Sequence, residues 1–454
     1  MKKIVQKLQQ HRVIIVLLFA ALIVRFYFLD KFTNVSGDLL LYADWGKMYW
    51  EYTSRNFYFV KDWYYAPPNY PPLVNLYYAY AYKAFDYKYL FAQLHNIIRF
   101  PPADFIIYYY KWGYFINLKI LAIVCDLLTG VLLYNFVYST LKKKKTAVFT
   151  AMLYLFNPVV ITLSSVWGQT DNVIAYFSVV SFILLFRKKF ALSSLLFIAG
   201  LLFKPNWVVF IPLYLLAFFL NRPRLKSILI SSVFVLLLLA ATAYPFSENP
   251  FTFYHWIISE RIIPTIGASK VASVSAFNFY TIFLRIDYHL SSFKILVVPV
   301  GLFGQLIFAG IYLAIFLGVI NKFLIHKKVS AVDFFKAILI LGLGSFLFLP
   351  GILERYFFPA IIPFAAIAVV RRKTFIIYLL LSLSFSLNIV WALFRRQYGE
   401  LDHLFTDSNF LLIRIFSLFN VLAFIFLFGL LFKDNLLKLD LWKKRANTLI
   451  QRLR

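Results

Sequence analysis

The stretch SGDLLLYADWGKMYWEYTSRNFYFVKDWYYAPPNYPPL, from Ser36 to Leu73, follows directly after the first long apolar segment of the chain. It combines two carboxylates near the end of that segment with many Trp and Tyr residues, and it closes on a turn, Asn69-Tyr70-Pro71-Pro72, that proline makes rigid. Carboxylates and aromatic rings at a membrane surface suit a site for a polar, ring-shaped substrate carried on lipid. We therefore expect the rest of the chain to be a scaffold around this stretch.

The composition predicts an all-α polytopic membrane protein. Of 454 residues, 62% are hydrophobic and only 15% are charged, which is far more apolar surface than one globule could bury. The net charge of +28 comes from short basic clusters between apolar runs. Such clusters orient helices and meet anionic lipid, so membrane lipids are expected partners and nucleic acid is not.

Several kinds of site have no support in the sequence. The one cysteine, Cys125, lies in an apolar run and cannot form a disulfide within the chain, and the six histidines are scattered without ligand spacing. No P-loop, GxGxxG or Gly-x-Ser-x-Gly element is present, which leaves nucleotide-driven transport and serine hydrolysis unsupported. We expect no metal and no cofactor.

Twelve apolar runs are long enough, or nearly so, to cross a hydrocarbon layer of ~30 Å at 1.5 Å per residue. The fourth, fifth, sixth and tenth runs are short and could be tilted partners in a thicker bundle. We treat residues 1–454 as a single domain. The runs lie at Val13 to Leu29, Phe115 to Val137, Ala147 to Ser165, Val173 to Phe186, Ala191 to Phe203, Trp207 to Leu220, Ile228 to Tyr244, Ile295 to Ile320, Val332 to Leu349, Phe358 to Val370, Phe375 to Phe394 and Phe410 to Phe432.

The basic clusters all fall in alternate loops, which predicts that both termini are cytoplasmic, in the plasma membrane. The clusters are Lys142 to Lys145, Arg187 to Lys189, Arg222 to Lys226, His326 to Lys328, Arg371 to Lys373 and Lys433 to Arg454. The two long loops, near 30–114 and 246–294, are then extracytoplasmic, and function is expected there. Within the first loop, Leu39 to Tyr49 and Phe105 to Trp112 are predicted to be surface helices with aromatic faces.

Asp38 and Asp44 form the first of four polar clusters on the predicted outer side. Six residues apart, they lie on different faces of a helix, which disfavours a metal-chelating pair. One of them could act as a general base toward a sugar hydroxyl. The alternative for Asp38 is a helix N-cap.

The second and third clusters are Trp167 to Asn172 and Lys204-Pro205-Asn206. Gln and Asn amides with a Trp ring are suited to hold a pyranose, whereas Asp171 could simply cap the next helix. Lys204 could contact a phosphate or could extend to the membrane interface.

The fourth cluster is Leu353-Glu354-Arg355-Tyr356, where arginine offers a planar fork for phosphate. The alternative is a structural Glu354–Arg355 ion pair. Elsewhere, Lys119 and Asp126 share a face of the second span and could pair.

In this order and on one side, these clusters resemble the GT-C glycosyltransferases, and within them the membrane mannosyltransferases related to GPI mannosyltransferase II. The chain departs from the family pattern at two positions: Leu353 stands where family members often have His, and Asn206 stands where they often have Gln. Both departures bear on the choice of sugar and acceptor. The matching residues are Asp38 with Trp45, Tyr70-Pro71-Pro72-Leu73, Trp167-Gly168-Gln169 with Asp171, Lys204-Pro205, and Glu354-Arg355-Tyr356 before Pro359.

The resemblance implies inverting transfer of a sugar, mannose or another hexose, from a polyprenyl-phosphate donor to a lipid- or glycan-linked acceptor. Asp38 takes the role of the catalytic base. A donor with one phosphodiester carries one negative charge, so a single Lys or Arg can neutralise the leaving phosphate without a divalent metal. Donor or acceptor binding falls to Asp44, Trp45, Tyr70, Trp167, Gln169, Asp171, Lys204, Glu354, Arg355 and Tyr356.

Two other functions share this composition. A lipid or sugar transporter would place its polar residues in broken helices at mid-membrane, with repeat symmetry. A ligase or polymerase of lipid-linked polysaccharide would centre on a large late loop rather than on Asp38 and the Tyr-Pro-Pro stretch. Release of polyprenyl phosphate would distinguish the glycosyltransferase.

Overall fold

The computed structural model describes residues 2–33, 36–52, 54–268, 270–295 and 297–436, so most of the predicted basic cluster at Lys433 to Arg454 lies outside the described residues. The chain divides into two compact units, and each is described by itself. The first unit comprises Met1–Val209, Pro223–Ser269 and Ile389–Tyr398. The second comprises Phe210–Arg222, Lys270–Asn388 and Gly399–Arg454.

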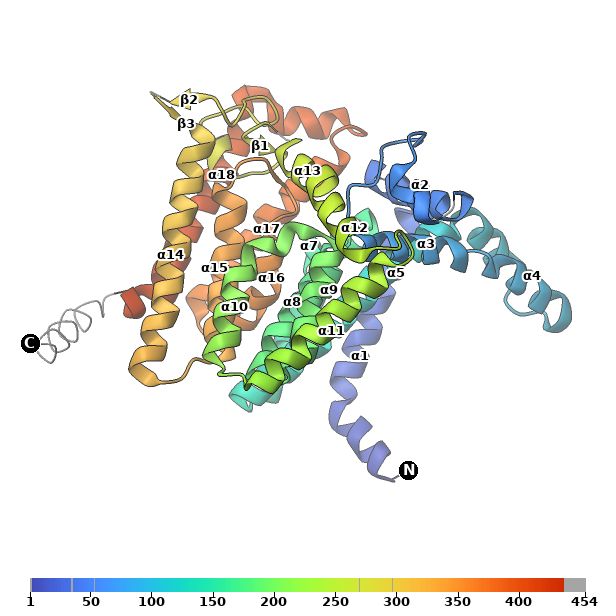
Figure 1. Ribbon diagram of the computed structural model, residues 1–454, viewed down its shortest axis with the longest axis horizontal. Coiled ribbons are helices and arrows are strands. Elements are labelled where there is room, and N and C mark those ends of the chain that lie inside the picture. Colours follow the sequence, from blue (N-terminus) through green and yellow to red (C-terminus); the bar gives the residue numbers. More distant parts are fainter. Residues whose placement is uncertain (1, 34–35, 53, 269, 296, 437–454) are drawn as a thin grey trace, which may run out of the picture. The chain divides into compact units, whose positions relative to one another are not determined.

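The first unit is helical and is arranged around the long helix α5, which packs against α1, α3, α6 and α8. Helix α9 packs against both α8 and α11, and the three run side by side (Figure 1). The elements are α1 (Lys2–Lys31), α2 (Gly37–Glu51), η1 (Ser54–Phe59), α3 (Pro72–Ala84), α4 (Tyr87–Ile98), α5 (Ala103–Leu141), α6 (Lys144–Leu155), α7 (Pro158–Ile161), the π-helix η2 (Thr162–Trp167), α8 (Asp171–Phe186), α9 (Phe190–Phe203), most of η3 (Pro205–Phe210), α11 (Leu225–Ala243), α12 (Pro250–Ile257), η4 (Ile258–Ile262) and α13 (Ile263–Ala268).

The second unit is built around α15, which is buried along almost its whole length and packs against α14, α16 and α18. Its short strands form two two-stranded sheets, β1 parallel to β4 and β2 antiparallel to β3. The elements are α10 (Ile211–Leu220), β1 (Ser273–Val274), η5 (Phe279–Ile282), β2 (Lys294–Ile295), β3 (Val298–Pro299), α14 (Val300–His326), α15 (Ala331–Phe348), β4 (Ile352–Leu353), η6 (Phe358–Ala360), α16 (Ile361–Ala368), most of α17 (Arg372–Phe394) and α18 (Gly399–Leu436).

Within the described residues, seven helices are long and apolar enough to cross a membrane, in agreement with an all-α membrane protein. An eighth candidate is a broken one, since Lys144–Leu155 and Pro158–Trp167 meet at a bend of 48°. Four further apolar helices are shorter, and they match the four runs predicted to be short. Twelve spans therefore remain a prediction. The short helices are Asp171–Phe186, Phe190–Phe203, Pro205–Leu220 and Phe358–Ala368.

Two predicted boundaries are wrong. The segment Phe105 to Trp112 is not a separate surface helix, because it forms the first turns of the 39-residue helix α5. Ile295 does not begin a span: it lies in β2, and α14 begins at Val300 after Pro299, which cannot donate a backbone hydrogen bond. The predicted helix from Leu39 to Tyr49 is confirmed, within α2.

Candidate functional site

Helix α2 is capped at its N-terminus by Ser36 and not by Asp38. The Ser36 side chain accepts a hydrogen bond from the Leu39 backbone N–H at 3.1 Å, so Ser36 is the N-cap. The Ser36 hydroxyl also donates to the Trp167 carbonyl at 3.3 Å. The N-cap interpretation of Asp38 is therefore wrong, because its neighbour two residues earlier satisfies the helix end.

The Asp38 carboxylate is held by two side chains from a segment about 130 residues further along the chain. Trp167 Nε1 donates to Asp38 Oδ2 at 3.1 Å, and Gln169 Nε2 donates to the same oxygen at 2.7 Å. Asp38 is half-buried, so part of the residue remains exposed to solvent. Two donors on one oxygen fix the orientation of the carboxylate.

The turn that carries Trp167 and Gln169 depends on Gly168 and on a buried lysine. Gly168 has φ +79°, and an added Cβ would lie 2.9 Å from Leu39 Cδ1, so glycine is required there. Lys119 Nζ donates to the carbonyls of Phe32 at 2.6 Å, Ser165 at 3.1 Å and Val166 at 2.9 Å. Lys119 thus ties the chain after α1 to the end of the π-helix η2. π-Helical turns are frequent at functional sites.

Two tyrosines extend the contacts of Gln169 toward Lys204. Tyr42 donates to Gln169 Oε1 at 3.2 Å, and its hydroxyl lies 3.4 Å from that of Tyr70. Lys204 Nζ lies 5.7 Å from the centroid of the Tyr70 ring, within cation–π distance. The Asn69–Pro72 turn quoted at the outset therefore contacts the same cluster as Asp38.

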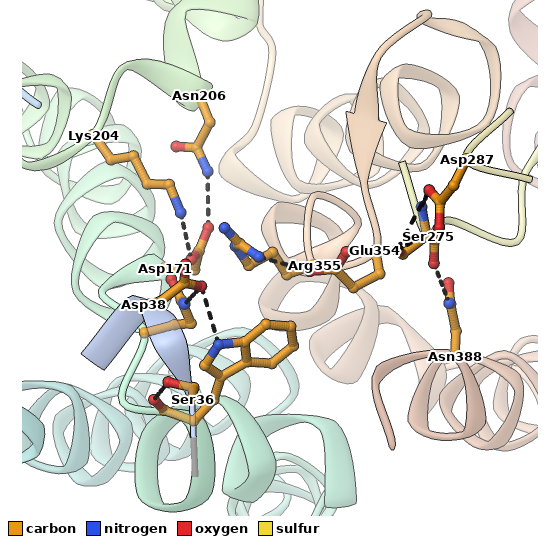
Figure 2. A network of polar contacts seen from close by, with 12 residues as sticks. Ser36, Asp38, Asp171, Lys204, Asn206, Ser275, Asp287, Glu354, Arg355 and Asn388 are labelled. Carbon is orange, nitrogen blue, oxygen red and sulfur yellow. Dashed lines mark hydrogen bonds and ion pairs between the residues drawn. The ribbon is translucent and has the colours of Figure 1, made fainter. Parts of the chain in front are cut away.

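Lys204 and Asp171 form a buried ion pair. Lys204 Nζ donates to Asp171 Oδ2 at 2.9 Å, and Asn206 Nδ2 donates to Oδ1 at 2.9 Å (Figure 2). The exposed fractions of the two side chains are only 2% and 1%. Lys204 does not extend to the interface, so that interpretation is wrong. Asp171 lies inside the first turn of α8, with Thr170 at the cap position, and its carboxylate contacts Lys204 instead of capping the helix.

Six sequence-predicted residues therefore lie together in the first unit, connected by a continuous series of contacts. We name this set the Asp38 cluster: Asp38, Trp167, Gln169, Tyr70, Lys204 and Asp171, joined by Tyr42 and Asn206. The sequence did not single out Tyr42, and it named Lys119 only as a possible partner of Asp126 and Asn206 without its contact to Asp171. The only available signal was that Tyr42 stands one helical turn after Asp38.

Asp44 lies apart from the Asp38 carboxylate, as expected for different faces of α2, whereas Trp45, seven residues after Asp38, shares its face and contacts the cluster through Tyr70. Trp45 is buried, donates from Nε1 to the Ala66 carbonyl at 2.8 Å, and packs edge-on against Tyr70. Asp44 is half-buried and accepts backbone hydrogen bonds from Tyr64 and Tyr65. Burial raises the pKa of Asp44 above its ordinary value of 3.8 despite these bonds. Trp45 supports the aromatic core behind the cluster.

Glu354, Arg355 and Tyr356 lie in the second unit. Arg355 Nη1 donates to Glu354 Oε1 at 2.7 Å, and both side chains are buried, as the structural-pair interpretation requires. The pair directly follows β4, whose partner β1 precedes Ser275. Asn388 Nδ2 donates to the Ser275 carbonyl at 2.7 Å, and Figure 2 shows Asn388 directed at that segment. Tyr356 is half-buried.

The suggested pair of Lys119 with Asp126 is wrong. Asp126 Oδ2 accepts from Arg25 Nε at 3.0 Å, and Oδ1 accepts from Tyr154 and Asn172. Arg25 on α1 faces α5, whereas Lys119, two turns away from Asp126, lies at the level of the Trp167 turn. Asp126 therefore pairs with a residue of another helix, Arg25 on α1, and not with Lys119 on its own helix.

No group of three or more His, Cys, Asp or Glu side chains within the described residues could hold a metal ion. The cluster can instead orient one half-exposed carboxylate beside aromatic rings, amides and a buried ammonium group. No family model matches the chain, and no curated protein is significantly similar to it.

Proposed function

We propose that the chain is an inverting GT-C-like glycosyltransferase that moves a hexose, such as mannose, from a polyprenyl-phosphate donor to a lipid- or glycan-linked acceptor at the extracytoplasmic membrane face. Both termini are cytoplasmic in this proposal, in the plasma membrane. Asp38 is the general base.

In the proposed reaction, the acceptor hydroxyl oxygen attacks the anomeric carbon and its proton passes to the Asp38 carboxylate. The bond between the anomeric carbon and the phosphate oxygen breaks. Its electron pair leaves with polyprenyl phosphate, and attack from the opposite face inverts the anomeric configuration. A cation near the leaving phosphate stabilises the charge that develops there.

The observation that carries the proposal is the fixed, half-exposed Asp38 carboxylate. A general base must be reachable by the hydroxyl that it deprotonates and must be oriented toward it. Trp167 and Gln169 orient Asp38 at distances of 3.1 and 2.7 Å, whereas the Asp171 side chain is only 1% exposed and is paired with Lys204. Of these two carboxylates, Asp38 alone meets both requirements.

Tyr70 and Lys204 support a sugar phosphate as the substrate class. Aromatic faces stack on pyranose rings, and a lysine is a common phosphate ligand. Tyr70 is linked through Tyr42 to Gln169, which orients Asp38, and Lys204 faces the Tyr70 ring, so ring recognition and phosphate recognition are connected to the proposed base.

The test uses purified protein in lipid nanodiscs with radiolabelled polyprenyl-phosphate hexoses and candidate acceptors. We expect release of polyprenyl phosphate, and Asp38→Asn should lower turnover about 10²- to 10⁴-fold with donor affinity nearly unchanged. Asn is isosteric and still accepts from Trp167 and Gln169, so folding should persist. Asp44→Asn, a matched change six residues along α2, should lose much less. Full turnover in Asp38→Asn would refute the assignment.

A further inference from the structure

Helix α4 exposes apolar side chains along its whole length. None of its 12 residues is buried. On one side it packs against the first turns of α5, where the Phe91 ring lies 5.7 Å from that of Phe105 and 5.2 Å from that of Tyr109. In Figure 1, α4 extends from the end of α3 away from α8, α9 and α11. Beside the face that packs on α5, Leu90 is 44% exposed and Ile97 is 78% exposed.

Helix α4 is amphipathic, and its exposed apolar stripe lies on the flank next to Phe91. Leu90, Leu94 and Ile97 follow at helical spacing i, i+4, i+7 and form one stripe with Ile98. Ile97 is 78% exposed and Ile98 is 61% exposed. Asn96 lies on a different sector of the same helix and is also exposed. A soluble surface would have polar groups where this stripe lies.

The turn between α4 and α5 continues this surface and adds positive charge. Phe100 is 66% exposed, and Arg99 beside it is exposed. Lys111 on α5 is exposed and lies 4.9 Å from the Trp112 ring centroid, and Lys88 lies 5.1 Å from that of Tyr110. Apolar side chains together with Tyr, Trp and basic residues are typical of a protein surface that lies in the lipid head-group layer.

The position of α4 along α5 matches that layer. Helix α5 has 39 residues, about 58 Å, and exceeds the ~30 Å hydrocarbon core. Tyr109, which contacts Phe91, precedes the apolar run at Phe115 by six residues, which is about 9 Å along the helix. Head groups add roughly 5 to 8 Å on each side of the core, and a tilted helix brings Tyr109 closer still.

We propose that α4 lies in the head-group layer of the membrane that α5 crosses, with Leu90, Leu94, Ile97 and Ile98 directed into lipid and Arg99 and Lys111 at lipid phosphates. Helix α4 is thus an interfacial anchor for the loop that carries Asp38. This inference is independent of the proposed transferase activity, since it concerns a different surface.

The test places single cysteines at Ile97 and at Asn96 in the full chain, labels each with the fluorophore NBD, and reconstitutes the protein in vesicles of phosphatidylcholine and phosphatidylglycerol. The native Cys125 is buried and its labelling gives the background. We expect the Ile97 probe to emit at shorter wavelength and to lose most of its emission when lipids spin-labelled near the head group are included. The Asn96 probe, one residue away, should be quenched much less.

Ile98 provides a second labelling position if the Ile97 label disturbs the helix. Equal, water-like emission at the two sides of α4 would overturn the proposal. A shielded Ile97 or Ile98 probe that lipid spin labels do not quench would also overturn it, because a protein partner or a second copy would then cover the stripe.

Discussion

The first unit contains two buried ion pairs, Arg25–Asp126 and Lys204–Asp171, with different surroundings. Arg25 and Asp126 are both 0% exposed, and carbonyls, Tyr154 and Asn172 supply their remaining contacts. Lys204 and Asp171 are nearly as buried, yet Lys204 faces the Tyr70 ring, and Asp171 follows Gln169 by two residues. Burial of a charge pair therefore does not by itself identify a site.

The two pairs differ in whether their neighbours lead to a polar side chain that is exposed to solvent. The Arg25–Asp126 pair joins α1 to α5, and Asn172 links it to the start of α8. The Lys204–Asp171 pair is connected through Tyr70, Tyr42 and Gln169 to the half-exposed Asp38. We expect the first pair to govern stability and the second to govern turnover.

Removal of one partner from the first pair should have the largest effect on stability. Asp126→Ala leaves Arg25 charged and buried without a counter-charge, which costs about 3 to 5 kcal/mol of folding free energy. Folded yield by size-exclusion chromatography and thermal unfolding in detergent measure this loss. The double variant Arg25→Gln/Asp126→Asn removes both charges and should recover much of the yield, with normal turnover per folded molecule. Asp126→Ala that folds well but is inactive would give this pair a functional role.

The matched double variant at the second pair should keep its folded yield but lose turnover. Lys204→Gln/Asp171→Asn replaces the ion pair by two amides, so folded yield should stay close to that of the native chain. Turnover of the polyprenyl-phosphate donor should fall about 10- to 100-fold, the size of one charge-assisted hydrogen bond of about 1.5 to 3 kcal/mol. If both double variants lose yield and neither loses turnover, the comparison between the pairs fails.

Lys119 should show an intermediate effect that separates positioning from stability. Lys119→Met removes the donor to three carbonyls at the Trp167 turn and should lower kcat roughly tenfold, which corresponds to about 1.4 kcal/mol, while KM for the donor changes little. Lys119→Arg retains N–H donors and should restore part of kcat. A purely structural lysine would instead reduce folded yield and leave kcat of the folded fraction unchanged.

The sequence was sufficient to predict the residue types of the Asp38 cluster but not their partners. Asp38, Trp167, Gln169 and Lys204 stand near the ends of apolar runs, where polar residues are informative because the membrane excludes them. The partner of Lys204 could not be read, because Asp171 is equally suited to capping α8.

Pairing between helices was the least predictable feature. Lys119 and Asp126, at spacing i, i+7, share a face of α5, and sequence spacing alone therefore predicted that they could pair. Arg25 lies 101 residues from its partner, and only the packing of α1 on α5 decides that contact. The four short spans were predicted from the length of their apolar runs, whereas the 48° break after α6 was not, although it falls at Asn157-Pro158, where proline disfavours continuation of the preceding helix.

The smallest expected effect is a pH dependence at Asp44, a carboxylate of α2 that does not contact the Asp38 carboxylate. Burial raises its pKa above 3.8, so the folded state binds this proton more tightly than the unfolded state. That contribution to stability is fully present below pH 3.8 and is lost as the pH rises through the folded-state pKa. At pH 7 the charged carboxylate therefore disfavours folding relative to a neutral amide of the same size. Asp44→Asn should raise Tm slightly at pH 7, and the difference from the native chain should shrink as the pH is lowered toward 4, as thermal unfolding in detergent would measure.

Asp86→Asn, which removes an exposed carboxylate paired with Lys83, controls for the loss of one negative charge. A lower Tm for Asp44→Asn at pH 7 would mean that the bonds from the Tyr64 and Tyr65 backbone outweigh desolvation, and that Asp44 stabilises the Tyr-Pro-Pro loop through its charge.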